Sequence, residues 1–585
     1  MDAHFLVTTR EVLGLAGEGV LALAPLPPGD AATLFLQRAE AAKHDFQPNA
    51  EDQAAIDPLV KLLEGLPLAI ELAAARVRVM PPRTLLLRMS ERFKLLTSGG
   101  ARVDRQATLR ATFDWSWQLL SLPERAALAQ LSVFEGGLTL EAAEAVLDLS
   151  DHENAPWPMD ALQSLVQKSF VRQAGDARFD LLVSVQEYAA EHLRTPARPS
   201  GSAAALAAQT RHGAYFAGLG EEAAAAGPSV ELDNFVVACR RAVARGDANM
   251  AVALLEGAWP GLQQHGPFRV GDELASLVLS MPALGEAATA RAQLVAGNAL
   301  QLSGRDAEAR LRFEAALALA RGIGDRNVEA QAQRRMGHLD DRAGRVESTR
   351  SRFGAAMAAA QELQDRRLES DVRNSLGNLA ESMGQYDDAR VHYESALAWA
   401  REAGDRHREA GILGNLGVMC TDQGRLDEAL VCYEAALAAA RETGSLHLAS
   451  NTRCNMGILL HLLGRLAESQ GHLEAALSAA RKLGHTQNEC EALCNLGIVF
   501  ESLTRPDVAQ AHFEAALGPG QHAGRFALGR PIAGLPGTTA RAPGQARRRA
   551  ALSGFGRDTA ACGGGSIRTG RAASQPRRGI PPCRR

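Results

Sequence analysis

The sequence of 585 residues has few aromatic residues, no long apolar run and no regular pattern of cysteines. Phe, Trp and Tyr together make up 5% of it. No stretch reaches the roughly 18 consecutive apolar residues that a transmembrane helix needs, and no basic start followed by an apolar segment marks a secretory signal. The eight cysteines are scattered and none precedes Cys239, which is not the pattern of a disulfide framework. We therefore expect a soluble, cytoplasmic protein that does not associate with membranes.

The sequence also lacks a pattern typical of a catalytic or metal site. No Ser-His-Asp, Cys-His or paired-carboxylate arrangement stands out, so we predict no catalytic residues. His392, His472 and His512 share one phase of a 40-residue period, but helical units about 10 Å apart cannot share one metal ion. Cys490 and Cys494 could clamp a metal only with two further ligands, which no pattern supplies. We interpret these side chains as solvated or packing residues and predict no metal site.

The formal charge of −4 conceals an uneven distribution. Residues 518–585 hold 13 Arg and a single acid, Asp558, and nearly a third of them are Gly or Pro. Such a segment buries too little apolar surface to fold, so we predict a disordered tail, and its composition is also that of GC-rich DNA translated out of frame. With a tail of +12, the first 517 residues carry −16. This argues against nucleic-acid binding by the body, although the tail could bind nucleic acid nonspecifically.

What the sequence does contain is a repeat of 40 residues. Each unit predicts two helices: helix A carries a glycine that permits close approach of its neighbour, a second glycine ends it in the left-handed conformation, and helix B places an aromatic residue among small ones on one face. A single pair cannot bury that face, so the units must stack into a solenoid. The recurring residues are Phe313, Phe353, Tyr393, Tyr433, Leu473 and Phe513, the first glycines Gly297, Gly337, Gly377, Gly417, Gly457 and Gly497, and the second glycines Gly304, Gly344, Gly384, Gly424 and Gly464.

The order Leu-Gly, Ala, aromatic, Ala at Leu376–Gly377, Ala389, Tyr393 and Ala396 resembles the tetratricopeptide (TPR) family in a 40-residue variant. The resemblance covers residues 290–517 and implies a right-handed α-solenoid of six repeats. Residues 203–289 are rich in Ala and lack a clean period, so we expect degenerate helical repeats that lead into the array.

The TPR family binds proteins or peptides on the concave face of its A helices, so the resemblance implies an unknown protein or peptide partner. Positions two before, one after and four after the first glycine would project there, and Asn offers donors and an acceptor to an extended peptide. The alternative is that these side chains satisfy neighbouring helices. The two interpretations are balanced for the three Asn two before the glycine, and the alternative is favoured elsewhere. The predicted partner-binding residues are Asn298, Gln301, His338, Asp341, Asn378, Glu381, Asn415, Thr421, Asn455, His461, Asn495 and Glu501.

The first 200 residues differ from the repeat array in their sequence pattern. The residue types predict a strand at 4–9, then helices near 31–43, 51–64, 67–79, 82–92, 107–119, 122–133, 139–148 and 159–168, a hairpin of strands 169–173 and 178–183, and a last helix at 185–194. Helices followed by a hairpin predict a winged helix within 101–200. Its helix 159–168 offers one basic residue, Lys168, against Asp160, so we do not expect sequence-specific DNA binding.

This region contains the phrases FLVTTREVLGLAGE at 5–18 and GLPLAIELAAARV at 65–77, followed by the predicted winged helix. These phrases resemble the STAND class of signal-transduction ATPases and the large LuxR-type regulators with an NB-ARC-like module. The resemblance implies that residues 1–100 are a remnant of the ATPase domain. In that family Thr9 and Arg10 would lie near the terminal phosphate, and Pro67 would contact the adenine.

The phosphate-binding loop of that class has no counterpart, because no Gly-Lys dipeptide occurs in the sequence. We therefore expect no cofactor and no enzymatic activity for this chain, whereas intact relatives would use ATP or ADP with Mg. We interpret the chain as an N-terminally truncated STAND protein, in which the effector domain is absent and whose intact relatives could self-associate.

The sequence thus predicts a mainly α regulatory protein that binds a partner through its TPR array. One alternative is a nucleotide-binding ATPase of the same family, if the true start lies upstream. A second alternative is nucleic-acid binding, through the winged helix or through the Arg-rich tail.

Overall fold

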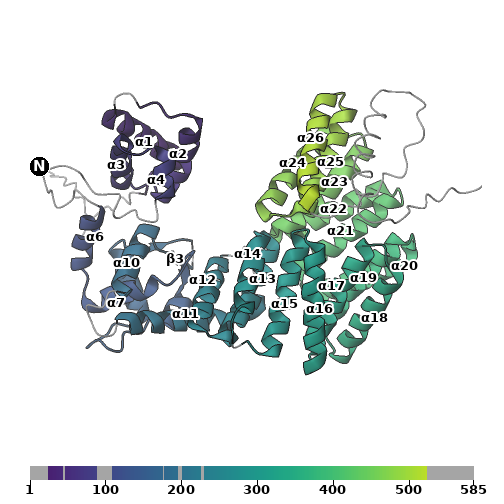
Figure 1. Ribbon diagram of the computed structural model, residues 1–585, viewed down its shortest axis with the longest axis horizontal. Coiled ribbons are helices and arrows are strands. Elements are labelled where there is room, and N and C mark those ends of the chain that lie inside the picture. Colours follow the sequence, from purple (N-terminus) through teal and green to yellow (C-terminus); the bar gives the residue numbers. More distant parts are fainter. Residues whose placement is uncertain are drawn as a thin grey trace, which may run out of the picture.

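The computed structural model describes residues 24–43, 46–88, 109–175, 177–194, 201–225, 230–282 and 284–522. The expected strand at 4–9, including Thr9 and Arg10, lies outside these ranges, and so do residues 523–585 of the predicted tail. The described chain forms three successive parts: a small helical unit, a winged helix and a long array of helical hairpins (Figure 1). The expected mainly α fold with a winged helix and a repeat solenoid is confirmed.

The first part is a unit of short helices around Phe35, Ile56, Leu59 and Ile70, which are fully buried. Prolines occupy the first turns of three of its helices, where a backbone N–H is not required. Before α3, Gly65 has a positive φ of 65° and its N–H and C=O bond to neighbouring backbone, so the chain turns sharply there. The elements are α1 (Pro28–Ala42), α2 (Ala50–Leu62), α3 (Pro67–Ala75), a 3-10 turn (Arg76–Arg78) and α4 (Pro82–Leu87).

The second part has the predicted order of helices and hairpin, with one addition. Strand β1 (Leu138–Thr139) pairs with β3 (Arg178–Asp180), which also pairs with β2 (Arg172–Gln173), so the hairpin extends into a three-stranded antiparallel sheet. The sequence placed the start of a helix at 139; instead the two-residue strand ends there and Thr139 caps the helix that follows. The helices are α6 (Leu109–Gln118), α7 (Leu122–Leu131), α8 (Leu140–Val146), α9 (Pro158–Gln167) and α10 (Val183–Arg194).

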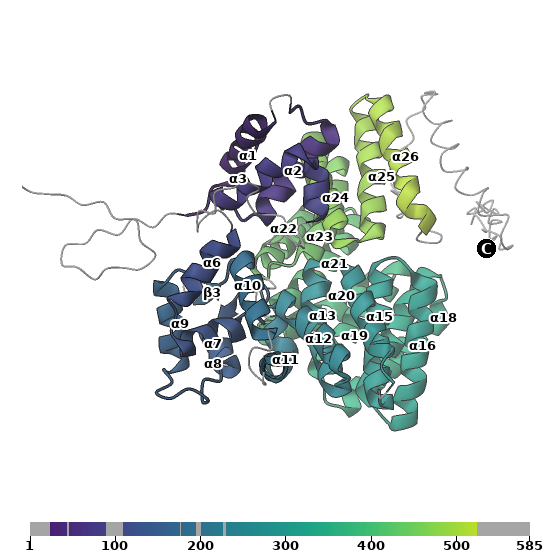
Figure 2. The ribbon, with the colours of Figure 1, turned by 60° about the vertical axis from the view of Figure 1, so that its left-hand side comes forward.

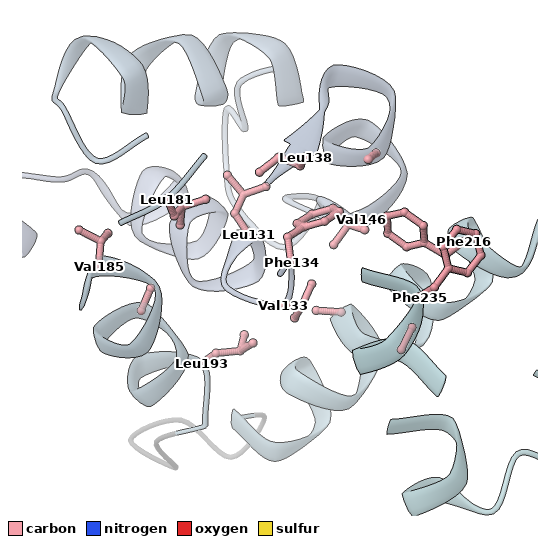
Figure 3. Close-up of a cluster of buried hydrophobic side chains, with 14 of the residues drawn as sticks. Leu131, Val133, Phe134, Leu138, Val146, Leu181, Val185, Leu193, Phe216 and Phe235 are labelled. Carbon is pink, nitrogen blue, oxygen red and sulfur yellow. The ribbon is translucent and has the colours of Figure 1, made fainter. Parts of the chain in front are cut away.

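A continuous apolar core joins the winged helix to the helices that follow it. Phe134 lies just after α7 and points toward Phe216 and Phe235, which come from the next two helices (Figure 3). The Phe134 and Phe216 ring centroids are 6.3 Å apart, and those of Phe216 and Phe235 are 5.4 Å apart. These lead-in helices are α11 (Gly201–Ala225), α12 (Leu232–Arg245), α13 (Ala248–His265) and α14 (Phe268–Leu279).

The third part consists of six helical hairpins whose A helices begin at exact steps of 40 residues. The A helices are α15 (Glu286–Leu302), α17 (Arg326–Arg342), α19 (Arg366–Ser382), α21 (Arg406–Asp422), α23 (Leu446–Leu462) and α25 (Thr486–Ser502). The B helices are α16 (Asp306–Ile323), α18 (Val346–Glu362), α20 (Tyr386–Glu402), α22 (Leu426–Glu442), α24 (Leu466–Leu483) and α26 (Pro506–His522). The last helix continues to His522, five residues beyond the end that the repeat phrase predicts.

Both glycines of the repeat have the roles that the sequence predicts. A Cβ atom on Gly337 would lie 2.4 Å from Cε1 of Phe353, and a comparable clash recurs in the other repeats, with Leu473 in place of the ring in the fifth, so helix A touches this side chain of helix B directly. The second glycine ends helix A with a positive φ, as at Gly344 (70°). In the last repeat Thr504 takes this conformation with a φ of 58°. Asp325, Asp365, Asp405 and Ser445 then cap the next A helices.

The array curls until its last repeat meets its beginning. The hydroxyl of Thr486, at the start of α25, donates a hydrogen bond to the carbonyl oxygen of Ser303 at 2.9 Å. The ring of Phe268, at the start of α14, contacts the imidazoles of His447 and His485, with centroids 5.9 and 5.7 Å away. Figures 1 and 2 both show the C-terminal repeats stacked over α13 to α15. The solenoid therefore encloses its A helices on the inner side.

Candidate partner-binding face

We call the half-exposed positions along the A helices, which point toward the axis of the curled array, the A-face. Three long-range interactions define it. The positive charge of Arg335 in the second repeat acts on His447 in the fifth, and that of Arg342 acts on His485 and Glu491 at the start of the sixth. Side chains of distant repeats therefore face each other across the interior of the solenoid.

Several predicted partner-binding residues link one A helix to the next. The Asn415 amide donates to Oδ1 of Asn374 at 3.0 Å. Nε2 of His338 lies 3.0 Å from the Ser375 hydroxyl. Nε2 of His461 lies 2.9 Å from the hydroxyl of Ser502, Asn495 approaches the sulfur of Cys454 at 3.8 Å, and Asp341 bonds to Ser382. These contacts support the alternative that such residues satisfy neighbouring helices, while leaving part of each side chain exposed.

Other predicted residues pack against the aromatic residue of their own hairpin. The hydroxyl of Tyr393 lies 2.7 Å from Oδ1 of Asn378 and 2.8 Å from Oε2 of Glu381, which is 7% exposed. Thr421 approaches the hydroxyl of Tyr433 at 3.4 Å. In the third and fourth repeats, the residues four after the glycine thus contact the polar aromatic ring of helix B.

The remaining predicted residues differ in exposure. Asn298 is 5% exposed and its Oδ1 is buried without a hydrogen-bond partner. Gln301, Asn455 and Glu501 are half-exposed, and no hydrogen bond is recorded for the side chain of Asn455 within the described ranges. The amide of Asn455 is therefore available to a partner.

The structure adds a charged cluster that the sequence prediction omitted. Arg408 donates to both oxygens of Asp371, at 2.8 and 3.2 Å, and to Asp405. Arg334 reaches Asp371 only at 3.8 Å, and Arg335 lies beside it. Arg335 occupies the position two before the first glycine, the same phase as Asn415, so the repeat pattern itself contained the signal.

Protein surrounds this cluster closely, and the pKa values of its groups are shifted accordingly. Burial raises the pKa of Asp371, but the charges of Arg334 and Arg408 outweigh burial and lower it to about 2. Burial holds the pKa of His338 and of His447 well below the ordinary value. Both imidazoles are half-exposed, so solvent reaches side chains that are otherwise enclosed. This combination is typical of a concave surface.

The outer side of the array carries a second concavity. A groove of about 480 Å³ runs between α20 and α22 with α21 as its floor, lined by residues that include Arg390, Leu397, Val431 and Cys432. Val431 is 66% exposed. The groove is open and partly apolar, so it is an alternative to the A-face as a contact surface for a partner.

The sequence predicts no metal site at the recurring histidines or at Cys490 and Cys494. His392, His472 and His512 lie on three B helices, α20, α24 and α26, and Cys490 interacts with Cys494 within α25. Within the described ranges, no three His, Cys, Asp or Glu side chains gather closely enough to hold a metal ion. Likewise, no described helix combines the length and apolarity needed to cross a bilayer.

The nucleotide contacts implied by the STAND resemblance are only partly in view. Pro67 is exposed at the first turn of α3, while Thr9 and Arg10 lie outside the described residues. No glycine loop with Lys accompanies Pro67 in the sequence. Pro67 alone does not form a nucleotide site.

The basic residue of the winged helix is engaged inside the domain. Nζ of Lys168 lies 2.8 and 2.9 Å from the two carboxylate oxygens of Glu124, which also bonds to the Ser164 hydroxyl and the backbone N–H of Ser121. Burial would raise the pKa of Glu124, but these hydrogen bonds lower it to about 2. Lys168 is therefore committed to the fold, and α9 presents no free cation to a phosphate backbone.

Comparisons with known proteins agree with these parts. Residues 120–194 match the winged helix-turn-helix domain family, and residues 368–442 and 448–518 match the tetratricopeptide repeat family. An uncharacterized protein of Mycobacterium bovis is 39% identical over 211 residues, which are 35% of this chain and 53% of that protein. A candidate HTH-type transcriptional regulator of Mycobacterium tuberculosis is 37% identical over 225 residues, 37% of this chain and 24% of the regulator. The chain spans about half the length of the first of these relatives.

Solved structures give looser similarities. A STAND protein with a tetratricopeptide repeat sensor from Pyrococcus horikoshii has 15% identity and a TM-score of 0.40, with 85% of this chain and 67% of that chain covered. A Rap protein complexed with competence and sporulation factor has 12% identity and a TM-score of 0.39, with 55% and 87% covered. At these identities and TM-scores, no functional site is inferred for this chain from those structures. The chain thus carries a winged helix-turn-helix domain followed by tetratricopeptide repeats. Its sequence resembles STAND-class regulators in this combination.

Proposed function

We propose that this chain is a regulatory protein whose A-face binds a protein or peptide partner. The observation that carries the proposal is the enclosed, polar A-face, on which side chains of the second repeat face those of the fifth and sixth. A polar concave surface lined by amides and guanidinium groups can satisfy an extended backbone along several repeats at once. No catalytic role is proposed.

The junction with the winged helix supports a regulatory role for the array. Asn234 of α12 accepts the backbone N–H of Glu135 at 2.7 Å and donates to the carbonyl oxygen of Gly137 at 2.9 Å. Arg241 also donates to the carbonyl oxygen of Val133 at 2.6 Å. Because this polar contact lies beside the shared apolar core, a change in the array's curvature would be transmitted to the winged helix.

Photo-cross-linking in the producing cells tests the proposal. Benzoylphenylalanine is placed in the full chain at Asn455 on the A-face or, as a matched control, at Val431 on the outer groove. We expect a protein or peptide to attach through position 455 and not through position 431. Attachment through 431 alone, or through neither position, would show that the A-face does not bind a partner.

DNA binding is a second candidate, because the winged helix matches a DNA-binding class of domain and some relatives carry the HTH-type regulator name. The engagement of Lys168 by Glu124 argues against it. Fluorescence anisotropy with a 30-base-pair random duplex decides the matter. We expect any binding to be lost when residues 523–585 are deleted, and binding retained by the shortened chain would favour the second candidate.

A further inference from the structure

Two cysteines occupy facing positions in the hairpin of the fourth repeat. Cys420 lies three residues after the first glycine of α21, and Cys432 lies one residue before the ring of α22. Both line the outer groove, where Cys420 is 2% exposed and Cys432 is half-exposed. Both thiols are free. No other repeat has a cysteine at either position, so the pair is specific to this hairpin.

Other repeats show that side chains at these two positions contact each other. In the second repeat, Nε of Arg352 donates to Oδ2 of Asp340 at 2.7 Å. In the sixth repeat, the rings of Phe500 and His512 stack with their centroids 5.2 Å apart. Because the repeats share one geometry, the two positions face each other across the hairpin in the fourth repeat as well.

The backbones of α21 and α22 approach closely beside the cysteines. A Cβ atom on Gly417 would lie 2.5 Å from Cε1 of Tyr433, so helix A touches the ring directly at this level. Cys420 is about one turn further along α21, and Cys432 is adjacent to Tyr433 in the sequence. At this spacing the short side chains meet, and a hydrogen bond joins Cys432 to Cys420. A disulfide needs such an approach, since its Cβ atoms stand about 4 Å apart.

The surroundings of the pair set how fast it can react. Burial, followed by the charge of Cys420, raises the pKa of Cys432 to about 11. The charge of Arg390 acts on Cys432 in the opposite direction, and its guanidinium lies 4.0 Å from Sγ of Cys420. The thiolate is the form that attacks a disulfide. Cys432 therefore reacts slowly near neutral pH and faster as the pH rises.

We propose that Cys420 and Cys432 form a site of reversible oxidation, at which exchange with a small-molecule disulfide ties α21 to α22. The half-exposed Cys432 loses its proton to solvent, and its thiolate attacks one sulfur of the small disulfide and expels the first small thiolate. Cys420 then loses its proton, attacks the sulfur of Cys432 and expels the second. The two cysteines are oxidised by two electrons, and the small disulfide is reduced to two thiols. This site lies on the outer groove and is independent of binding at the A-face.

Peptide mapping of the full chain tests the site, with oxidised glutathione as the probe. The chain is equilibrated with an excess of the probe at about pH 8.5, where thiolates are populated, and then alkylated and digested with trypsin. Cleavage after each arginine places Cys420 in peptide 409–425 and Cys432 in peptide 426–441. We expect most of these two peptides to be recovered as one disulfide-linked species. Dithiothreitol should return them to separate peptides.

Melting temperatures connect this link to the fold. The disulfide closes a short loop around the turn between α21 and α22, and so limits the conformations of the unfolded hairpin. We expect oxidation to raise the melting temperature of the wild type by about 5 °C. Cys432→Ser should show no such rise. Cys494→Ser makes the same change at a half-exposed cysteine of α25 and should retain the rise.

Three results would overturn the proposal. The first is that the two peptides stay separate at equilibrium. The second is that peptide 409–425 joins the peptides of other cysteines as often as it joins 426–441, which would show that the two thiols do not face each other. The third is an oxidised wild type that melts no higher than the reduced chain, because the hairpin would then have to distort to accept the link.

Discussion

At the scale of single residues, the contact between a glycine and a ring sets the distance between the two helices of each hairpin. Replacing Gly337 with Ala places a methyl group 2.4 Å from Cε1 of Phe353, which is buried and cannot withdraw. We expect Gly337→Ala to lower the free energy of unfolding by about 1–3 kcal/mol, the cost of overpacking a core. Urea denaturation followed by circular dichroism measures the change.

Gly354 provides the matched control for this substitution. It lies within α18, and a Cβ atom there would meet nothing within 4 Å. Gly354→Ala should therefore raise the free energy of unfolding by up to about 1 kcal/mol through helix propensity. Equal effects at the two positions would contradict the role assigned to the ring contact.

Gln364 is a residue whose side chain conflicts with its backbone conformation. It has a φ of 53° at the turn between two hairpins, where Gly324, Gly404, Gly444 and Gly484 occupy the equivalent positions of other repeats. The left-handed conformation costs a residue other than glycine about 1–2 kcal/mol. Because glycine also loses more entropy on folding, we expect Gln364→Gly to stabilise the array by about 0.5–1 kcal/mol.

The midpoint of urea unfolding checks this expectation. Gly404→Ala is the reciprocal control, because its φ is 67° and space for a Cβ atom is open. It should lower the midpoint. A higher midpoint for Gly404→Ala, or a lower one for Gln364→Gly, would show that the left-handed backbone conformation does not determine the stability of these turns.

At the scale of elements, the winged helix depends on Glu124. Glu124 is 8% exposed, and its carboxylate completes the capping box of α7 with Ser121 and binds Lys168 from the end of α9. We expect Glu124→Gln to destabilise the domain by about 3 kcal/mol, since it leaves a partly buried ammonium group without its counter-charge. Differential scanning calorimetry measures the loss.

Two further variants test the cause. Glu144→Gln makes the same change on the exposed side of α8 and should alter stability by less than about 0.5 kcal/mol. Combining Glu124→Gln with Lys168→Met should recover part of the loss, because the uncompensated charge is then gone. A double variant no more stable than the single one would contradict the ion pair's role.

Helices and turns can be predicted from the sequence where a repeat, or a glycine that ends a helix, defines them. The positions of Gly337, Phe353 and Gly344 predicted the hairpin, its close packing and its turn, because a 40-residue period makes the same physical demand six times. Strand β1 escaped prediction because two residues carry no periodicity. The phase of Arg335 follows from the repeat, but the residues that lie across the array from it depend on the curvature of the solenoid, which a local pattern does not encode.

At the scale of the whole molecule, closure of the solenoid places histidines in an apolar contact. His485 is 6% exposed, and its ring stacks on that of His447 beside Phe268. Burial, followed by the charge of Arg342, lowers the pKa of His485 to about 4. Between the ordinary value of 6.5 and about 4, the unfolded chain binds a proton that the folded chain excludes.

Stability is therefore complete above pH 6.5 and falls as the pH decreases toward 4. At about 1.4 kcal/mol per pKa unit, His485 contributes a loss of about 3 kcal/mol across this range. His485→Asn keeps an acceptor at the helix cap and removes the titration. We expect its urea midpoint to decline less steeply with acidification than that of the wild type, and identical slopes would contradict the assignment.

The central claim is that the inner A-face, and not the outer groove, binds the partner. The most direct measurement is the affinity, by isothermal titration calorimetry, of the partner captured through position 455 for two full-chain variants. Asn455→Arg fills the A-face, whereas Val431→Arg fills the outer groove with the same side chain. We predict that Asn455→Arg weakens binding at least about tenfold and that Val431→Arg changes it less than about twofold. The reverse order would contradict the claim.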